Sequence, residues 1–294
     1  MLRSYLLITK PGIIFGNLIT AVAGYVLAAK GNIDFVTFTA MIVGTVCIIA
    51  SGCVFNNVID RDIDQLMSRT KYRKPLLESI SVNKALAYAT LLGCIGFASL
   101  ALYASMMSFY FGVLGFVVYV GLYTLYYKRK SIYGTFVGSI SGACPPVMGY
   151  CAVNGQFDIG AVVILAIFCI WQIPHSYAIA IYRFKDYKDA NIPVLPIVSG
   201  VEVARKHMIG FIVAFTVLAL SLFTLNYVGA IFASFTFIIG LIWLLSTIFD
   251  FHRMDNHTWA KRVFILSLVA ITSMSVLMSV DFAHIDQNAY VTAR

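Results

Sequence analysis

Residues 36–64 read VTFTAMIVGTVCIIASGCVFNNVIDRDID, and this stretch decides the fold class. No charged side chain occurs from residue 36 to residue 59, and roughly 20 apolar residues in a helix are enough to cross a bilayer. Carboxylates follow at once, at Asp60, Asp62 and Asp64. The stretch therefore predicts a membrane-spanning helix that ends in an acidic cluster.

The rest of the chain has the same character. Of its 294 residues 60% are hydrophobic and only 12% are charged, whereas a soluble domain carries about 25% charged residues. This composition excludes a water-soluble fold and predicts an all-α, polytopic membrane protein. We expect nine membrane-spanning helices, at residues 12–29, 36–59, 83–104, 109–127, 132–153, 159–181, 207–226, 229–249 and 262–281.

The distribution of basic residues predicts how the chain lies in the membrane. The net charge of +8 could suggest a nucleic-acid partner in a soluble protein, but here Lys and Arg occupy the polar breaks between apolar segments. With the N-terminus in the cytoplasm, all but two of the 21 Lys and Arg residues, Lys30 and Arg294, fall on the inner side. We therefore expect an inward N-terminus, no nucleic-acid partner, and one domain over residues 1–294. The six cysteines show no paired spacing typical of disulfide or zinc sites, and no cleaved leader is expected.

The first long inward segment carries a candidate metal site. If the helix continues past residue 59, Asn56, Asp60 and Asp64 recur at every fourth position and project from one face. Like charges stacked in this way repel each other, so the pattern favours a bound cation, and oxygen ligands suit Mg²⁺. The alternative is a solvated acidic helix end neutralised by Arg61 and Arg69.

The second long inward segment, YRFKDYKD at residues 182–189, repeats this chemistry with Tyr182, Lys185 and Asp186. Two acidic clusters surrounded by basic side chains could hold metal ions with a diphosphate between them. Positive-inside topology alone is the alternative explanation for each basic residue. The candidates for phosphate contacts are Arg69, Lys71, Arg73, Lys128, Arg129, Arg183 and Lys185.

A histidine lies inside the sixth predicted span, in QIPHSY at residues 172–177. Ionisable residues within membrane spans are usually functional, which makes His175 a candidate site residue. The alternative is a histidine that hydrogen-bonds to a neighbouring helix.

The two acidic motifs resemble those of the UbiA-type intramembrane prenyltransferases. The first motif is Asn56-x3-Asp60-x3-Asp64, and the second is the cluster of Tyr182, Lys185 and Asp186. Further stretches are similar to the branch of that superfamily that farnesylates heme, and the resemblance runs from about residue 5 to residue 280. They include TKPG at 9–12, ASGCVFNN at 50–57, ACPPVMGY at 143–150 and WQIPH at 171–175.

This resemblance implies nine helices around a central cavity, in the inner membrane of a bacterium. It implies an enzyme that transfers farnesyl from farnesyl diphosphate to the 2-vinyl group of heme b, with addition of water, giving heme O. Mg²⁺ would be held by Asn56, Asp60, Asp64 and Asp186. The three aspartates and His175 would act in catalysis, with His175 on the porphyrin side, as a contact to heme or as a group that orients the water. The family also implies a heme-copper oxidase assembly that receives heme O.

Two alternatives, and a departure in the second motif, accompany this interpretation. A quinone-type aromatic prenyltransferase of the same superfamily would differ in its acceptor. A cation-coupled transporter would place its carboxylates near the bilayer midplane instead of at the interface. The departure is Ala190, which stands where the superfamily's second motif has a further carboxylate, with Asp189 one position earlier.

Overall fold

The computed structural model describes residues 2–68, 70 and 80–283. Within these ranges the chain is helical apart from turns and one isolated β-bridge. Nine helices in this part are long and apolar enough to span a membrane, which confirms the predicted all-α polytopic architecture. The spans are α2 (Pro11–Ala29), α3 (Phe35–Ile59), α6 (Val82–Tyr103), the composite α7–η2–α8 (Met106–Lys130), α9 (Gly134–Asn154), α10 (Ile159–Tyr182), α13 (Val201–Thr224), α14 with η3 (Ala230–His252) and α15 (Asn256–Val280).

Several spans begin earlier than the sequence predicts. The seventh starts at Val201 instead of residue 207, and the ninth at Asn256 instead of residue 262. The predicted starts lie at or just after the last charged residue of each polar break, Lys206 and Arg262. A helix can carry charged side chains in its first turns where it leaves the apolar layer, so the backbone is already helical there.

Side chains cap the N-termini of α3, α6, α7, α10 and α15. The capping oxygens belong to Asp34, Ser81, Ser105, Asp158 and Asp255, and each accepts a backbone N–H from the first turn of its helix. Such caps satisfy donors that have no partner inside the helix, and they fix where each span begins.

The fourth span changes its hydrogen-bonding pattern midway. After α7 (Met106–Phe116) the chain forms a π-helix, η2 (Val117–Tyr127), and then one short turn, α8 (Lys128–Lys130). π-Helical segments are rare and are frequent at functional sites. This one carries Thr124 and leads directly to the basic residues of α8.

Helices α2 and α9 cross at very short range because each contributes a glycine. A Cβ on Gly24 would lie 2.0 Å from the carbonyl oxygen of Pro146, and a Cβ on Gly149 would lie 1.9 Å from that of Ala21. No larger residue fits at either position without moving backbone. Small residues at such crossings are the usual means of packing helices within a membrane.

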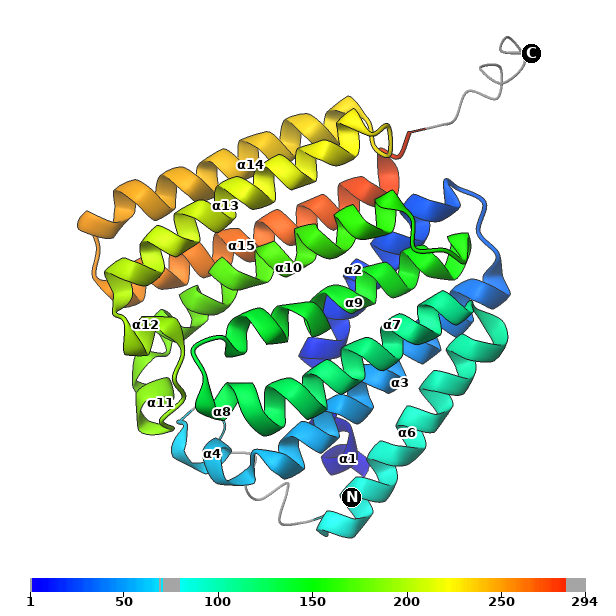
Figure 1. Ribbon diagram of the computed structural model, residues 1–294, viewed down its shortest axis with the longest axis horizontal. Coiled ribbons are helices and arrows are strands. Elements are labelled where there is room, and N and C mark those ends of the chain that lie inside the picture. Colours follow the sequence, from blue (N-terminus) through cyan, green and yellow to red (C-terminus); the bar gives the residue numbers. More distant parts are fainter. Residues whose placement is uncertain (1, 69, 71–79, 284–294) are drawn as a thin grey trace.

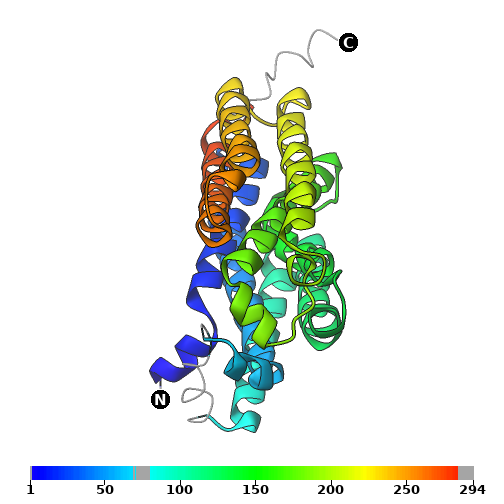
Figure 2. The same ribbon diagram turned by 90° about the vertical axis from the view of Figure 1, so that its left-hand side faces the viewer.

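Helices α2, α9, α10 and α15 pack against one another in a closed ring (Figure 1). Helix α9 also packs against α7 and α10, α10 packs against α13 and α15, and α15 returns to α2. Helix α1 (Leu2–Ile8) and the end of α15 lie at opposite ends of the bundle (Figure 2). The short helices α4 (Arg61–Leu66), α8, α11 (Phe184–Asp189) and α12 (Leu195–Val198) gather at one end.

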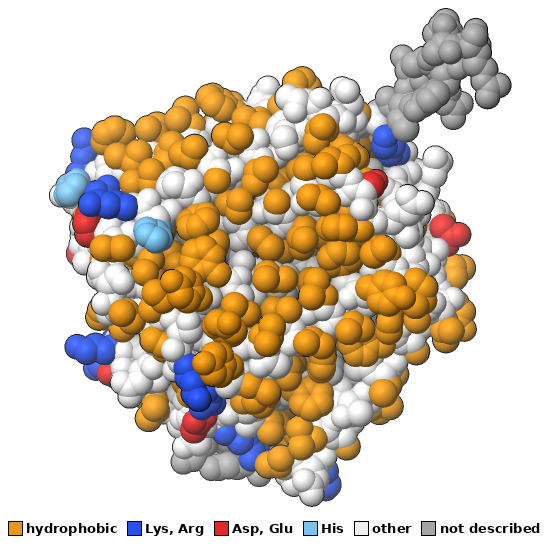
Figure 3. Space-filling model, in the orientation of Figure 1, with side chains coloured by type: hydrophobic (Ala, Val, Ile, Leu, Met, Phe, Trp, Pro, Cys, Tyr) orange, Lys and Arg blue, Asp and Glu red, His pale blue; other side chains and the backbone are white. Residues whose placement is uncertain are grey.

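The outer surface suits a lipid environment. Hydrophobic side chains cover the middle of the face in Figure 3, and the charged ones lie towards its rim. Phe35, Leu102 and Val217 are among the large apolar residues that are mostly exposed. The chain is a multi-pass membrane protein. The central cavity inferred from the resemblance stays a prediction.

Candidate active site

The two charged segments predicted to form the site lie side by side at one end of the bundle. Ile63 and Met67, from α4 and the residue after it, pack against Ala190 and Ile192, which follow α11. All four side chains are buried. This small apolar contact joins parts of the chain far apart in sequence and brings the two acidic motifs to the same end (Figure 1).

The first acidic motif is buried and nearly helical throughout. Helix α3 ends at Ile59, as the predicted span does, and α4 begins at Arg61, so the helix is interrupted at Asp60. The break is slight, because the N–H groups of Asp60 and Asp64 still donate to carbonyl oxygens four residues earlier, each at 2.8 Å. The spacing of Asn56, Asp60 and Asp64 is thus kept, and these side chains are only 3%, 0% and 7% exposed.

Hydrogen bonds fix the orientation of the Asn56 amide. Its Nδ2 group donates to Asp60 Oδ2 at 2.7 Å and to Thr124 Oγ1 at 3.1 Å. The Thr124 hydroxyl in turn donates to the carbonyl of Tyr119 at 2.8 Å, within the π-helix. The other end of the amide, Asn56 Oδ1, accepts a hydrogen bond from Lys10 Nζ. The amide nitrogen therefore faces protein acceptors, and the amide oxygen faces a cation.

Two basic residues at the end of the fourth span neutralise the aspartates. Lys128 forms an ion pair with Asp60, and Arg129 reaches the second oxygen of the same carboxylate at 3.2 Å. Arg129 also donates to both oxygens of Asp62, at 2.7 and 2.8 Å, and to the carbonyl of Ile59 at 2.9 Å. The hydrogen bonds from Arg129 lower the pKa of Asp62 to about 2.

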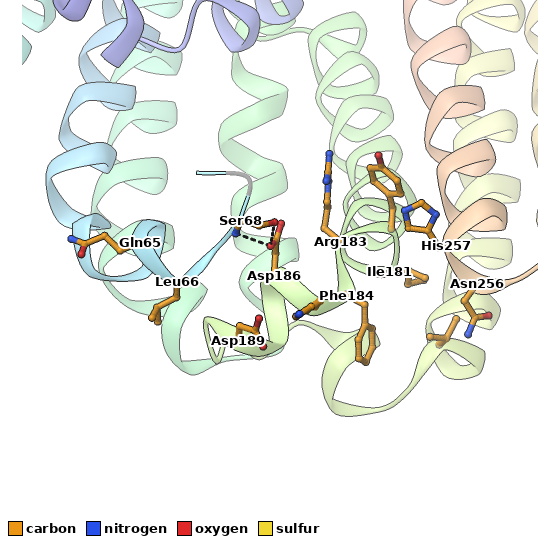
Figure 4. Close-up of a pocket in the computed structure, with 13 residues that line it drawn as sticks. Gln65, Leu66, Ser68, Ile181, Arg183, Phe184, Asp186, Asp189, Asn256 and His257 are labelled. Atoms are coloured by element: carbon orange, nitrogen blue, oxygen red, sulfur yellow. Dashed lines mark hydrogen bonds between the residues drawn. The ribbon is translucent and has the colours of Figure 1, made fainter. Parts of the chain in front are cut away.

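The second acidic motif is tied to the first segment by Ser68. Both the backbone N–H and the hydroxyl of Ser68 donate to Asp186 Oδ1, at 2.9 and 2.6 Å (Figure 4). Asp186 is buried, whereas Asp189 is exposed. Ser68 is the second residue after α4, so this contact positions α11 against the end of the Asn56–Asp64 motif.

An open pocket of about 780 Å³ lies between these segments and the α10–α15 pair. Asp186, Arg183 and Lys185 line it, and Figure 4 shows Arg183 and His257 across from Asp186. The Tyr182 ring lies 4.6 Å from the His257 ring, and the Arg183 guanidinium lies 4.5 Å from the Tyr182 ring centroid. The pocket combines cations, a carboxylate and aromatic rings. Its lining includes Asp186 but not the Asn56–Asp64 motif.

The donor set fits Mg²⁺ in its chemistry. Asn56, Asp60, Asp64 and Asp186 offer only amide and carboxylate oxygens, the ligands that this ion prefers. The ammonium groups of Lys10 and Lys128 already contact two of these oxygens, which shows that they attract cations. Within the described ranges no three His, Cys, Asp or Glu side chains form a closed metal-binding group. The convergence of Asp60, Asp64 and Asp186 on one ion therefore stays a prediction.

His175 lies in α10, away from the aspartates. Its Nδ1 atom is 2.7 Å from Ser267 Oγ of α15, and its ring stacks 4.6 Å from Trp171, at an interplanar angle of 26°. Phe264 packs against the same ring at 5.1 Å. The structure therefore shows the interhelical hydrogen bond that the sequence left as an alternative, and it adds a stack of rings around the imidazole.

The predicted set of site residues and the observed contacts differ in two ways. Arg69, Lys71 and Arg73 lie outside the described residues. Sequence reasoning assigned no role to Lys10, Thr124, Ser68, Ser267 or His257, which the structure places on the predicted site residues. The TKPG stretch contained Lys10. No motif marked the serines and the threonine, because their roles depend on contacts between distant segments.

Known proteins are similar to this chain in sequence and in architecture. The model of the UbiA prenyltransferase family matches residues 17–269. A protoheme IX farnesyltransferase of Pectobacterium carotovorum subsp. carotovorum is 53% identical over 96% of this chain and 95% of its own length. That of Escherichia coli O139:H28 is 51% identical over 100% of this chain and 99% of its own.

Solved structures agree in fold. A UbiA homolog from Archaeoglobus fulgidus bound to GPP and Mg²⁺ has a TM-score of 0.70 at 15% identity, covering 94% of this chain and 99% of its own. A UbiA homolog from Aeropyrum pernix K1 has a TM-score of 0.69 at 18% identity, covering 91% and 95%. The family match and the relatives above 50% identity decide the assignment. The chain therefore belongs to the UbiA prenyltransferase family, as a multi-pass membrane enzyme that transfers prenyl groups.

Proposed function

We propose that this enzyme transfers a farnesyl group from farnesyl diphosphate to the 2-vinyl group of heme b, with addition of water, giving heme O and diphosphate. The observation that supports farnesyl diphosphate as the prenyl donor is the buried Asn56–Asp60–Asp64 motif. It lies among Lys10, Lys128 and Arg129 at one end of an apolar bundle. The relatives named protoheme IX farnesyltransferase, at 51 to 53% identity over nearly the whole chain, support heme as the acceptor.

The diphosphate end of the donor would bind among the basic side chains. Lys128 and Arg129 on one side, and Arg183 and Lys185 on the other, are the described candidates, and Arg69, Lys71 and Arg73 are the further ones. Mg²⁺ held by Asn56, Asp60, Asp64 and Asp186 would supply positive charge that stabilises the departing diphosphate. Tyr182, beside Arg183 in the pocket, would contact the same substrate.

The basic residues would act where charge develops. As the bond between the allylic carbon and the diphosphate oxygen breaks, negative charge grows on the leaving group, and fixed cations there bind the transition state better than the ground state. Asp60 holds Lys128 and Arg129 in place through the ion pairs seen in the structure. The apolar helices would keep water from the allylic cation until the electron-rich vinyl carbon has reacted.

The acceptor would lie on the α10 side of the site. His175 is the residue we assign to the porphyrin, since it lies about 10 Å along α10 from Tyr182 at a rise of 1.5 Å per residue. After the new carbon–carbon bond forms, one water adds to the former vinyl group and completes the hydroxyethylfarnesyl side chain.

The cellular setting follows from the same proposal. We place the chain in the inner membrane of a bacterium, with the N-terminus and the charged end of the bundle in the cytoplasm, consistent with the distribution of Lys and Arg. Residues 1–294 would form a single prenyltransferase domain. A heme-copper oxidase assembly would receive the product.

Mass spectrometry of extracted hemes tests the proposed function. Cells without a heme-farnesylating enzyme are compared with and without this chain, and we expect a heme heavier by a farnesyl and a hydroxyl group only when the chain is present. Asp60→Ala and Asp64→Ala are expected to abolish this product while the protein still inserts. Glu202→Ala, which removes an exposed carboxylate on α13, serves as the control and should retain activity.

Near-normal turnover of either aspartate variant would contradict the metal assignment. A farnesylated aromatic acid or quinone precursor, with no change in heme, would contradict the proposed acceptor.

A further inference from the structure

The imidazole of His175 is held more firmly than an interhelical hydrogen bond requires. Trp171 and His175, one turn apart on α10, both contact Ser267 of α15: Trp171 Nε1–H donates to its carbonyl at 2.9 Å, and His175 Nδ1 lies 2.7 Å from its hydroxyl oxygen. Stacking on Trp171 and packing by Phe264 restrict rotation of the ring. These contacts therefore fix the plane of the imidazole ring and the directions in which its two nitrogens point.

Counting protons on Ser267 settles which nitrogen of His175 carries hydrogen. Ser267 Oγ lies 2.6 Å from the carbonyl oxygen of Phe264, and because a carbonyl has no proton, the single hydroxyl proton must lie between them. Ser267 Oγ can then only accept from His175. Nδ1 consequently carries the proton, and in the neutral ring Nε2 carries a lone pair. Among the described residues Nε2 has no hydrogen-bond partner.

We propose that Ser267 is a positioning residue that holds His175 as the Nδ1–H tautomer, so that Nε2 binds the iron of the heme substrate. This inference rests on the proposed function, which makes heme the acceptor. Histidines that ligate metals usually donate the other ring N–H to an oxygen acceptor, which fixes the tautomer and the ring direction. The contact between His175 and Ser267 has this form.

The surroundings of His175 are apolar, as a contact with a porphyrin would require. The ring stack of Trp171, His175 and Phe264 is apolar, and His175 is partly accessible in spite of its position inside a span. Gly142, on the facing helix α9, leaves room for Gln172, because a Cβ there would lie 2.1 Å from the Gln172 amide oxygen. Iron ligation would anchor the porphyrin on α10 while its vinyl group reaches towards the charged end of the bundle.

Heme titration of the full-length enzyme in detergent, without farnesyl diphosphate, tests this inference. Ferric heme b is added, and the Soret and visible bands report the iron ligands. We expect wild-type protein to show the spectrum of histidine-ligated heme, His175→Ala to lose it, and added imidazole to restore it in that variant. Ser267→Ala should weaken heme binding about tenfold, the lower end of the effect seen for residues that orient metal ligands.

Two further variants separate positioning from folding. Ser267→Thr keeps a hydroxyl and should retain the wild-type spectrum. Ser273→Ala removes a hydroxyl on the same helix that bonds only to backbone carbonyls, and it should also behave as wild type. Identical spectra for wild type and His175→Ala would overturn iron ligation, and an unchanged heme affinity in Ser267→Ala would overturn the role of Ser267.

The same protein is assayed with farnesyl diphosphate by mass spectrometry. Formation of the farnesylated heme without a His175-dependent spectrum would refute the inference and leave the proposed function intact. A His175-dependent spectrum without farnesyl transfer would refute the proposed function instead.

Discussion

Thr124→Val changes one hydroxyl in the middle of the candidate site. Valine keeps the shape of the side chain, which is fully buried in the π-helix η2. The substitution removes the donor to the Tyr119 carbonyl and the acceptor of Asn56 Nδ2–H. The contact between Asn56 and Asp60 is retained, so the variant loosens the amide without removing a proposed metal ligand.

The expected loss of stability follows from the two hydrogen bonds of Thr124 that the substitution removes. Hydrogen bonds between membrane helices contribute about 0.6 kcal/mol on average, whereas a buried donor left without a partner costs about 1–3 kcal/mol. Thr247→Val is the matched control, because Thr247 is equally buried and its hydroxyl bonds only to the Trp243 carbonyl. The difference in unfolding free energy between the two variants isolates the contact of Thr124 with Asn56. We expect this difference to be about 1–2 kcal/mol.

Two measurements check this prediction. Thermal unfolding in detergent should show Thr124→Val to be less stable than Thr247→Val. The kcat/KM for farnesyl diphosphate should fall in Thr124→Val alone, because Asn56 must then be oriented when the transition state forms; a cost of the same 1–2 kcal/mol corresponds to a fall of about 5- to 30-fold. Thr124→Ser, which keeps the hydroxyl, should recover most of the activity. Equal activity of Thr124→Val and Thr247→Val would refute the claim that Thr124 orients Asn56.

Three further predictions concern packing, acid stability and metal dependence. Gly149→Ala should greatly reduce the yield of folded protein, because its Cβ would meet the Ala21 carbonyl at 1.9 Å, while Gly121→Ala, with open space around it, should express normally. Asp62 has a pKa lowered from 3.8 to about 2 by Arg129, so the stability it contributes is present above pH 3.8 and lost as the pH falls towards 2. The side chain is 66% exposed, so we expect Asp62→Asn to reduce the acid sensitivity of unfolding only slightly in a pH series. EDTA should stop farnesyl transfer, and added Mg²⁺ should restore it in the heme assay.

Local sequence patterns predicted most of the fold. Uncharged stretches long enough to cross a bilayer gave the nine spans, because only helices satisfy every backbone hydrogen bond within one segment in lipid. The four-residue spacing of Asn56, Asp60 and Asp64 predicted their common face, since helical periodicity is a local property. The same reasoning missed the early starts of α13 and α15, because charges near the interface do not end a helix.

By itself, the sequence determined that this chain spans the membrane repeatedly. It also indicated which polar residues are functional, because burying such residues within a membrane costs free energy. Only the tertiary structure decided what those residues contact. Thr124 lies beside Asn56, Ser68 on Asp186, and Ser267 on His175, each pair far apart along the chain. No local sequence pattern identifies the hydrogen-bond partner of a hydroxyl group. That partner is set by helix packing, which places distant segments within hydrogen-bonding distance.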